Sequence, residues 1–354
     1  MRDDESSAHR HADAVRSFAF VAPRHPDGSD WPWLSHIGPM RRHRFTPIYI
    51  ENTLKPLPRG TRMYVQWQYL RAMYAIRRTE LTFLFSTEIG VGMTSWTSRL
   101  IRQPKRIYVG FTQDGVWPQA KIDRLSRALR QCDAITVFSD DERRLYLQRY
   151  GLDPARVHLI PIHTDEMQGY AQYPDVRPID SPYVLSLGSP NRRFMPIARA
   201  CSSLKIPLVI ITRPWHKNDS LDELAALGAT IITDADKMKS LTYLKHARFS
   251  AMCFETPELP GAFTTLIHAM FMRTPSVVTS CLGMGDYIVD GENGFVTPHG
   301  DEAALQWAID RLWNEPGLTE GFADAGYARA MGLFSLEAAA ERFDALAEAV
   351  LRGH

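Results

Sequence analysis

The sequence predicts an α/β protein with two doubly wound domains, each a mostly parallel sheet with helices on both faces. The chain has 354 residues, more than a single hydrophobic core usually holds. Its composition is globular, with 45% hydrophobic and 23% charged residues, which excludes disorder for most of the chain. Strand-like and helix-like runs alternate from about residue 18 onward, as in parallel sheets covered by helices.

The first half of the chain carries strand-like runs rich in β-branched and aromatic residues. They are residues 18–22, 47–50, 81–87, 106–112, 134–139 and 157–162. The helical patterns that accompany them are residues 63–78, 94–102, 119–131 and 141–150. Asp140 and Asp141 precede Glu142 and favour a helix start there, because acidic side chains are stabilised at the positive end of the helix dipole.

The second half repeats this alternation after a stretch rich in Pro, Asp and Tyr. Its strand-like runs are residues 183–187, 207–212, 230–233, 248–254 and 276–280. Its helical patterns are residues 194–204, 221–227, 238–246, 264–273 and 336–351, and the chain is largely helical beyond 301. We therefore expect a flexible leader (1–16), a first domain (17–165), a linker (166–182), a second domain (183–335) and a C-terminal helix (336–354) that can cross back to the first domain.

Charge and cysteine content exclude several classes of function. The 41 basic and 40 acidic residues give a net charge of +1, so no overall attraction to nucleic acid is expected. The four cysteines lie far apart without a CxxC pair, which argues against a zinc site or disulfide framework. No apolar run approaches the ~20 residues of a membrane span, and the N-terminus lacks the apolar centre of a signal peptide. We expect a cytoplasmic protein that needs no metal or other cofactor.

The most informative stretch is residues 254–298, because it combines a strand, a loop, a helix start and a glycine turn. In doubly wound domains, ligands bind where the carboxyl ends of strands meet helix N-termini, and a cleft between two such domains is the expected active site. The loop ends at Gly261, and the helix begins near Phe263 with the hydroxyls of Thr264 and Thr265. Its free backbone N–H groups suit a diphosphate; the alternative is a simple turn with a helix cap.

The whole stretch resembles the donor-sugar half of family 4 glycosyltransferases of the GT-B fold. In that family a Glu-x7-Glu element and an Ala-Met run precede a strand, a glycine loop and an Asp-Gly-x-Asn-Gly turn. The matching residues here are His268-Ala269-Met270, Thr274-Pro275, Val277-Val278, Gly283 to Gly285, Asp290 to Gly294, and Pro298. The match covers residues 254–313, and the two-domain alternation extends it across the chain.

The departures from the family pattern concern its two glutamates. The second, which the resemblance places at the nucleotide ribose, falls on His268, and the first, near the donor sugar, falls on Pro260. Glu255 and Glu258 lie close by, and we expect Glu258 to take the role of the missing carboxylate. A neutral imidazole at His268 can donate to or accept from a ribose hydroxyl. The alternative is a histidine that is simply packed on an amphipathic helix.

Cations near the ends of two strands are the candidates for holding the diphosphate. The family places an Arg and then a Lys after the glycine that ends the first strand of this domain, whereas here Ser189 follows Gly188. Arginine suits bidentate phosphate contact, although each cation alone could be a solvated surface charge. The predicted donor-binding residues are Gly188, Ser189, Arg192, Arg193, Arg213, Lys217, Gly261, Phe263, Thr264, Thr265 and His268.

In the first domain, the candidates follow two predicted strands. The family has a turn that touches the donor sugar at the position of Gln113 and Asp114, and we expect Asp114 to handle the acceptor proton. The alternative for Asp114 is an Asx turn residue. Gly90 and Gly92 can let an acceptor approach the backbone, although the third glycine of GxGxxG is absent.

Two further signals have simpler explanations. The triplet Asp234-Ala235-Asp236 spells a metal-binding DxD, but it follows a strand of the second domain and is interpreted as a loop. The helix 63–78 mixes basic and aromatic residues, which suits either an anionic membrane surface or an ordinary amphipathic helix.

The resemblance implies a glycosyltransferase of the hexosyltransferase type, retaining and metal-independent, that acts in polysaccharide biosynthesis. It would move a sugar from a nucleotide-diphosphate sugar to a glycan, a lipid-linked acceptor or a small glycoside, with peripheral membrane contact through the first domain. The alternatives are a nucleotide-sugar epimerase or phosphorylase of the same fold, or a non-catalytic partner protein of the same fold.

Overall fold

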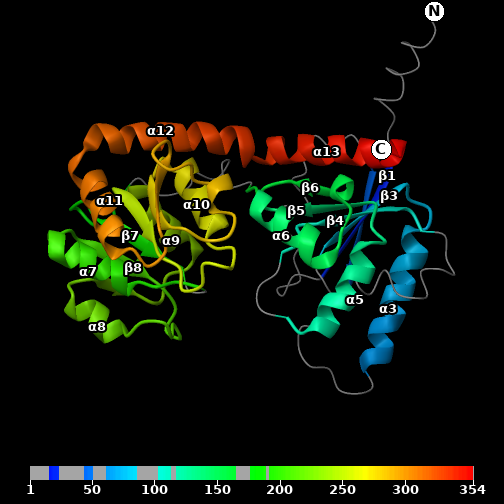
Figure 1. The fold of residues 1–354 in the computed structure, drawn as a ribbon, viewed down its shortest axis with the longest axis horizontal. Coiled ribbons are helices and arrows are strands. Elements are labelled where there is room, and N and C mark those ends of the chain that lie inside the picture. The colour runs from blue at the N-terminus through cyan, green and yellow to red at the C-terminus, as the bar shows by residue number, and fades with distance from the viewer. Residues whose placement is uncertain are drawn as a thin grey trace, which may run out of the picture.

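Two parallel six-stranded sheets form the framework of the protein. The computed structural model describes residues 16–23, 44–50, 61–85, 103–112, 117–164, 176–188 and 191–353. All strand pairs within the two sheets are parallel, and helices pack against both faces (Figure 1). The α/β architecture with two doubly wound sheets, predicted from the alternation of runs, is confirmed.

The first sheet has the strand order β2-β1-β3-β4-β5-β6. Its strands are β1 (Ser17–Pro23), β2 (Arg44–Ile50), β3 (Leu81–Phe85), β4 (Lys105–Val109), β5 (Ala134–Val137) and β6 (Val157–Leu159). The helices α3 (Thr61–Ile76), α5 (Gln119–Leu129) and α6 (Asp140–Tyr150) accompany them. Apolar side chains of α3, α5 and α6 bury one face of this sheet, because alternate strand residues point to the same side.

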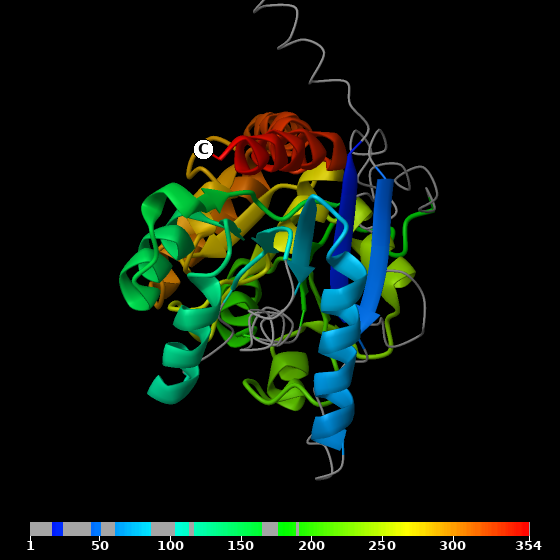
Figure 2. The same cartoon turned by 90° about the vertical axis from the view of Figure 1, so that its right-hand side faces the viewer.

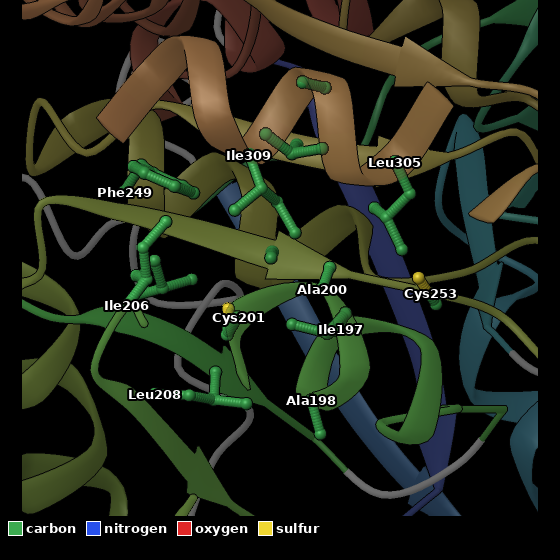
Figure 3. Packing of buried hydrophobic residues seen from close by; sticks show 14 of the residues in the cluster. Ile197, Ala198, Ala200, Cys201, Ile206, Leu208, Phe249, Cys253, Leu305 and Ile309 are labelled. Carbon is green, nitrogen blue, oxygen red and sulfur yellow. The ribbon is translucent and has the colours of Figure 1, made fainter. Parts of the chain in front are cut away.

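The second sheet has the strand order β12-β11-β10-β7-β8-β9. Its strands are β7 (Val184–Leu187), β8 (Leu208–Ile211), β9 (Thr230–Ile232), β10 (Phe249–Met252), β11 (Ser276–Thr279) and β12 (Gly294–Thr297). The helices α7 (Met195–Leu204), α8 (Leu221–Ala226) and α11 (Glu302–Asn314) pack on one face, and α9 (Lys237–His246) and α10 (Phe263–Phe271) on the other. Figure 3 shows part of the first of these cores, where Ile197 of α7 lies close to Leu305 and Ile309 of α11.

The structure corrects several predicted boundaries. The strand β12 was not predicted, because it has only four residues and its first, Gly294, belongs to the predicted glycine turn. A Cβ at Gly294 would lie 2.6 Å from the Ser276 carbonyl oxygen. The strand β4 ends at Val109 rather than at 112, because Gly110 turns the chain with a φ of 64°. The predicted helix at 94–102 lies outside the described residues.

The last two helices connect the halves of the molecule. After α12 (Pro316–Leu333), α13 (Leu336–Arg352) lies over the first sheet (Figures 1 and 2). Its Phe343 and Val350 are buried in one cluster with Phe18 and Phe20 of β1. Arg16, the last residue of the predicted leader, pairs with Glu348 of this helix at 3.0 Å. The predicted return of the C-terminal helix to the first domain is confirmed.

All four cysteines are free and buried, and burial raises the pKa of each thiol to about 12, so these thiols stay protonated at neutral pH. Across the described ranges, every helix is too short or too polar to cross a membrane.

Candidate functional site

The loops at the carboxyl edge of the second sheet are bonded to one another. We call residues 188, 191–194, 213–220, 253–262 and 280–287 the carboxyl-edge platform. The Asn191 side chain donates to the carbonyl oxygen of Thr256 at 3.1 Å and accepts from its N–H at 2.7 Å. The Asn218 amide donates to the carbonyl oxygen of Arg192 at 2.8 Å. These bonds tie the loops after β7, β8 and β10 together, which holds them in a defined arrangement.

Arg192 is the buried cation of this platform. Its Nε donates to the carbonyl oxygen of Leu187 at 3.3 Å, and its guanidinium carbon lies 5.1 Å from the centre of the Phe254 ring. Burial lowers the pKa of Arg192 to about 10, so the side chain remains charged at neutral pH. Gly188 has a φ of 117°, and a Cβ there would lie 3.0 Å from Nε of Arg192. The glycine therefore permits both the turn and the close arginine.

The start of α10 lies beside the same aromatic ring. A Cβ on Gly261 would lie 2.7 Å from the ring of Phe254, so glycine is required for this contact. Ala262 follows with a φ of 62°, and no side chain caps the helix. Thr264 is exposed and Thr265 is half-buried. Arg192, Gly261 and the N-terminus of α10 thus lie around Phe254, and Gly188 lies against Arg192. From the sequence, Phe254 could be predicted only as the end of a strand.

Of the other predicted cations, Arg213 and Lys217 are exposed and Arg193 is half-buried. Arg193 donates to the Glu255 carboxylate at 2.9 Å and approaches Asp219 at 3.5 Å, and the hydrogen bond to Glu255 raises the pKa of Arg193. Arg213 lies 6.0 Å from the ring of Trp215 in the loop after β8, which also carries the exposed Lys217. Glu258 is exposed in the turn after β10.

Asp219 organises this region and was missed from the sequence. Its carboxylate accepts from the backbone N–H groups of Phe194 at 2.7 Å and of Met195 at 3.3 Å, and so caps α7 from another loop. Nε2 of His216 lies 3.0 Å from the same carboxylate, and both side chains are almost fully buried. A sequence contains no local signal for this cap, because the carboxylate comes from more than twenty residues downstream of the helix start.

His268 and Phe263 lie on the sides of α10 that face the connection between the two sheets. The His268 side chain is buried, with Nε2 3.4 Å from Oγ1 of Thr164, which follows β6 of the first sheet. The ring of Phe263 is buried and stacks on Tyr287 with centroids 4.0 Å apart. These two predicted donor-binding residues therefore contact the junction between the sheets.

The junction joins α6 of the first sheet to the loop after β11. The backbone N–H of Asp140 donates to Asp286 at 2.8 Å, and that of Gly283 donates to Asp141 at 3.0 Å. The hydroxyl of Tyr287 donates to the carbonyl oxygen of Phe138 at 2.9 Å. Burial and the neighbouring carboxylates of Asp140 and Asp141 raise the pKa of Asp286. The carboxyl edges of both sheets therefore meet at this junction.

In the first sheet, the buried carboxylate of Glu142 links the segments that follow β4 and β5 at the edge that faces this junction. Glu142 accepts hydrogen bonds from the Thr112, Ser139 and Tyr146 hydroxyls at 2.6, 3.1 and 3.1 Å, and from the Phe138 N–H at 3.2 Å. Burial raises the pKa of Glu142 in spite of these bonds. Ser139 caps α6 directly before Asp140, which confirms the predicted helix start. The remaining predicted residues, Gly90, Gly92, Gln113, Asp114 and Ser189, lie outside the described residues.

The DxD triplet has a local structural role. Asp236 caps α9 by accepting from the N–H of Lys239 at 2.7 Å, and Asp234 pairs with the Lys239 ammonium at 3.1 Å. Within the described part of the chain, no group of three His, Cys, Asp or Glu side chains is arranged to hold a metal ion.

Comparison with known proteins places this geometry in context. Residues 192–315 match the family model described as glycosyl transferases group 1, and no curated protein sequence is significantly similar to the chain. Among solved structures, sucrose-phosphate synthase from Thermosynechococcus elongatus is 17% identical with a TM-score of 0.69, covering 96% of this chain and 100% of that one.

Two further structures are similar over comparable lengths. A glycosyltransferase from Rickettsia africae is 14% identical with a TM-score of 0.70, covering 96% of this chain and 100% of that one. Anabaena HepE, solved in complex with UDP, is 12% identical with a TM-score of 0.70, covering 95% of this chain and 100% of that one. The chain therefore has the GT-B fold, and its second sheet domain carries the segment that matches glycosyl transferases group 1.

Proposed function

We propose that this protein is a glycosyltransferase that moves a hexosyl group from a nucleotide-diphosphate sugar to an acceptor. The observation that supports this most directly is that Arg192, Gly261 and the start of α10 lie around Phe254, with Gly188 against Arg192. This group lies within or next to the segment that matches glycosyl transferases group 1. We assign donor binding to the second domain (183–335) and acceptor binding to the first (17–165).

The donor diphosphate would lie between Gly188 and the N-terminus of α10. Its charge would be balanced by Arg192 and by the helix N-terminus, where no side chain competes as a cap. Arg213 and Lys217 are exposed in the neighbouring loop and add positive charge. HepE was solved with UDP and with UDP-glucose, so uridine-diphosphate sugars are the first donors to test.

The chemical step would be a retaining, metal-independent transfer of the family 4 type. The bond between the anomeric carbon and the diphosphate oxygen breaks, and the acceptor hydroxyl oxygen forms the new bond. The acceptor proton passes to an oxygen of the departing diphosphate. Arg192 and the start of α10 would stabilise the negative charge that develops on this leaving group, which is the largest demand of the reaction.

The finer roles of the other residues follow from their places in the chain. His268 would contact the nucleotide ribose, and Glu258 would approach the donor sugar when the loop after β10 rearranges. Asp114 and Gln113, together with Gly90 and Gly92, would form the acceptor side. Closure of the two domains would exclude water and so limit hydrolysis of the donor.

The acceptor would be a glycan, a lipid-linked sugar or a small glycoside, used at the cytoplasmic face of a membrane. The helix α3 supports peripheral membrane contact, since Trp67 and Tyr74 are 52% and 59% exposed and lie on one stripe. Arg71 and Arg77 stack on these two rings. Vesicles with anionic lipid should bind the protein more weakly after Trp67→Ala, and equal binding by the two proteins would refute this contact.

Calorimetry with UDP-, GDP-, ADP- and dTDP-sugars tests the donor assignment. At least one donor should bind, and Arg192→Gln should weaken its binding at least about tenfold, because a charge-assisted phosphate contact is lost. Arg192→Lys should retain part of the affinity, and Arg199→Gln, an exposed arginine of α7, should retain all of it. Absence of binding to every donor would refute the proposal.

A second candidate is a non-catalytic partner protein of the same fold. It is favoured by Pro260 and His268 at the positions of the two family glutamates, and by the pairing of Glu255 with Arg193. Such a protein would form no product with any donor and acceptor, and Arg192→Gln would leave its function intact. Product formation from the donor alone would instead identify an epimerase or phosphorylase.

A further inference from the structure

A cavity of about 960 Å³ opens at the amino edge of the first sheet. The last turn after α3 supplies Arg77 and Arg78 to its wall, the start of β4 supplies Lys105 and Arg106, and the approach to β5 supplies Asp133. This edge of the sheet is opposite to the one that faces the junction, and Leu351 of α13 closes one side. The cavity is therefore separate from the proposed donor site.

The charge of the cavity wall is positive after its ion pairs are taken into account. Asp133 accepts from the Lys105 ammonium at 2.9 Å and from the backbone N–H of Arg106 at 2.8 Å. Glu80, the other carboxylate of the wall, is paired with Arg16 at 3.0 Å. Arg77 lies over the ring of Tyr74 at 3.4 Å, and Arg78 is exposed at the rim.

Arg106 is a buried cation without a matched anion. Arg106 is only 6% exposed. Among the described residues, its guanidinium forms no ion pair and its Nε has no hydrogen-bond partner. Burial lowers the pKa of Arg106, with Asp133 only partly opposing that effect. A buried, unpaired charge is costly, and native structures rarely keep one without a partner.

A second unpartnered polar group lies beside Arg106. Thr82 of β3 is directly opposite Arg106 of β4 in the strand register, so both side chains point to the same face of the sheet. The Thr82 side chain is fully buried, and its hydroxyl has no hydrogen-bond partner among the described residues. Two buried polar groups next to each other in the sheet therefore lack partners within the described part of the chain, and the Arg106 side chain lines the cationic cavity.

We propose that this cavity binds an oxyanion, namely a phosphate group, with Arg106 as the inner contact and Arg78 at the rim. The planar guanidinium of Arg106 can donate two parallel N–H groups to one phosphate. The phosphate can belong to a small phosphorylated molecule or to a lipid headgroup, since both present the same oxygens.

Calorimetric titration of the full chain with inorganic phosphate and with glycerol 3-phosphate, at constant ionic strength, tests this site. Vesicles of phosphatidylcholine with and without phosphatidic acid form a parallel arm. We expect saturable binding that Arg106→Gln weakens at least about tenfold, because a charge-assisted hydrogen bond is lost. Binding to the small phosphates identifies a soluble ligand, and binding only to phosphatidic acid vesicles identifies a lipid headgroup.

Three further variants keep the test decisive. Arg78→Gln, at the exposed rim, should weaken phosphate binding several-fold and cannot disturb the core. Arg124→Gln removes an exposed arginine of α5 outside the cavity and should change nothing. Arg192→Gln should leave this binding intact, which separates it from phosphate held at the donor site. The proposal is overturned when no arm shows saturable binding, or when binding persists in both Arg106→Gln and Arg78→Gln.

Discussion

Gly283→Ala tests the close contact between the two sheet domains. Gly283 has a φ of 80°, and a Cβ there would lie 2.4 Å from Oγ of Ser139 and 3.0 Å from the ring of Phe263. A left-handed alanine costs roughly 1–2 kcal/mol. Relief of the clash also requires the loop to move, which breaks the hydrogen bond from the Gly283 N–H to Asp141.

That hydrogen bond contributes about 1.5 kcal/mol, the low end for a charged acceptor, because the Asp141 side chain is 38% exposed. The total loss in the free energy of unfolding should therefore be about 3 kcal/mol, measured by urea unfolding. Gly285→Ala is the matched control, since it lies in the same loop, has ordinary φ and has open space around its Cβ position. Equal stability of the two variants would refute the account of this junction.

Two further predictions concern the carboxylates of Asp219 and Asp286. Asp219→Ala should lower the free energy of unfolding by about 1–2 kcal/mol, because α7 loses its cap. The control Asp222→Ala, at an exposed position of α8, should lower it less. An equal decrease for the two variants in urea unfolding would contradict the capping role of Asp219. The pKa of Asp286 is raised in the folded protein, so its contribution to stability is present below its ordinary value of 3.8 and is lost as pH rises through the folded pKa. The free energy of unfolding of Asp286→Asn, relative to that of the wild type, should consequently increase as pH rises toward neutral. A difference between the two free energies that stays constant across pH would contradict this.

Much of the fold follows from local patterns, and the exceptions have physical causes. The runs at 81–87 and 134–139 predicted β3 and β5 because buried parallel strands are continuous apolar segments. The strand β12 was missed because Gly294 and its short length remove that signal, and its partner β11 fixes it only through tertiary contact. The extent of β4 was overestimated because the turn at Gly110 depends on a φ value that the residue type permits but does not impose.

The candidate site shows the same division. A basic residue after the first strand of the second domain could be predicted, but the choice between Arg192 and Arg193 could not. The structure buries Arg192 against Phe254 and pairs Arg193 with Glu255, because the backbone bridge from Arg193 to Cys253 directs their side chains differently. The contact of His268 with Thr164 joins residues more than a hundred positions apart, and no local pattern could reveal it.

The sequence by itself determined the two doubly wound domains and the C-terminal helix, and it predicted an anion-binding site at the start of α10. These features depend on periodicity and on residue types within short windows, which local sterics and burial dictate. Only the tertiary structure decided which cations are buried, which groups donate to Asp219 and Glu142, and that Arg106 lies opposite Thr82 and lines a cationic cavity. Those outcomes depend on strand register and on contacts between distant segments, which the order of residues along the chain does not display.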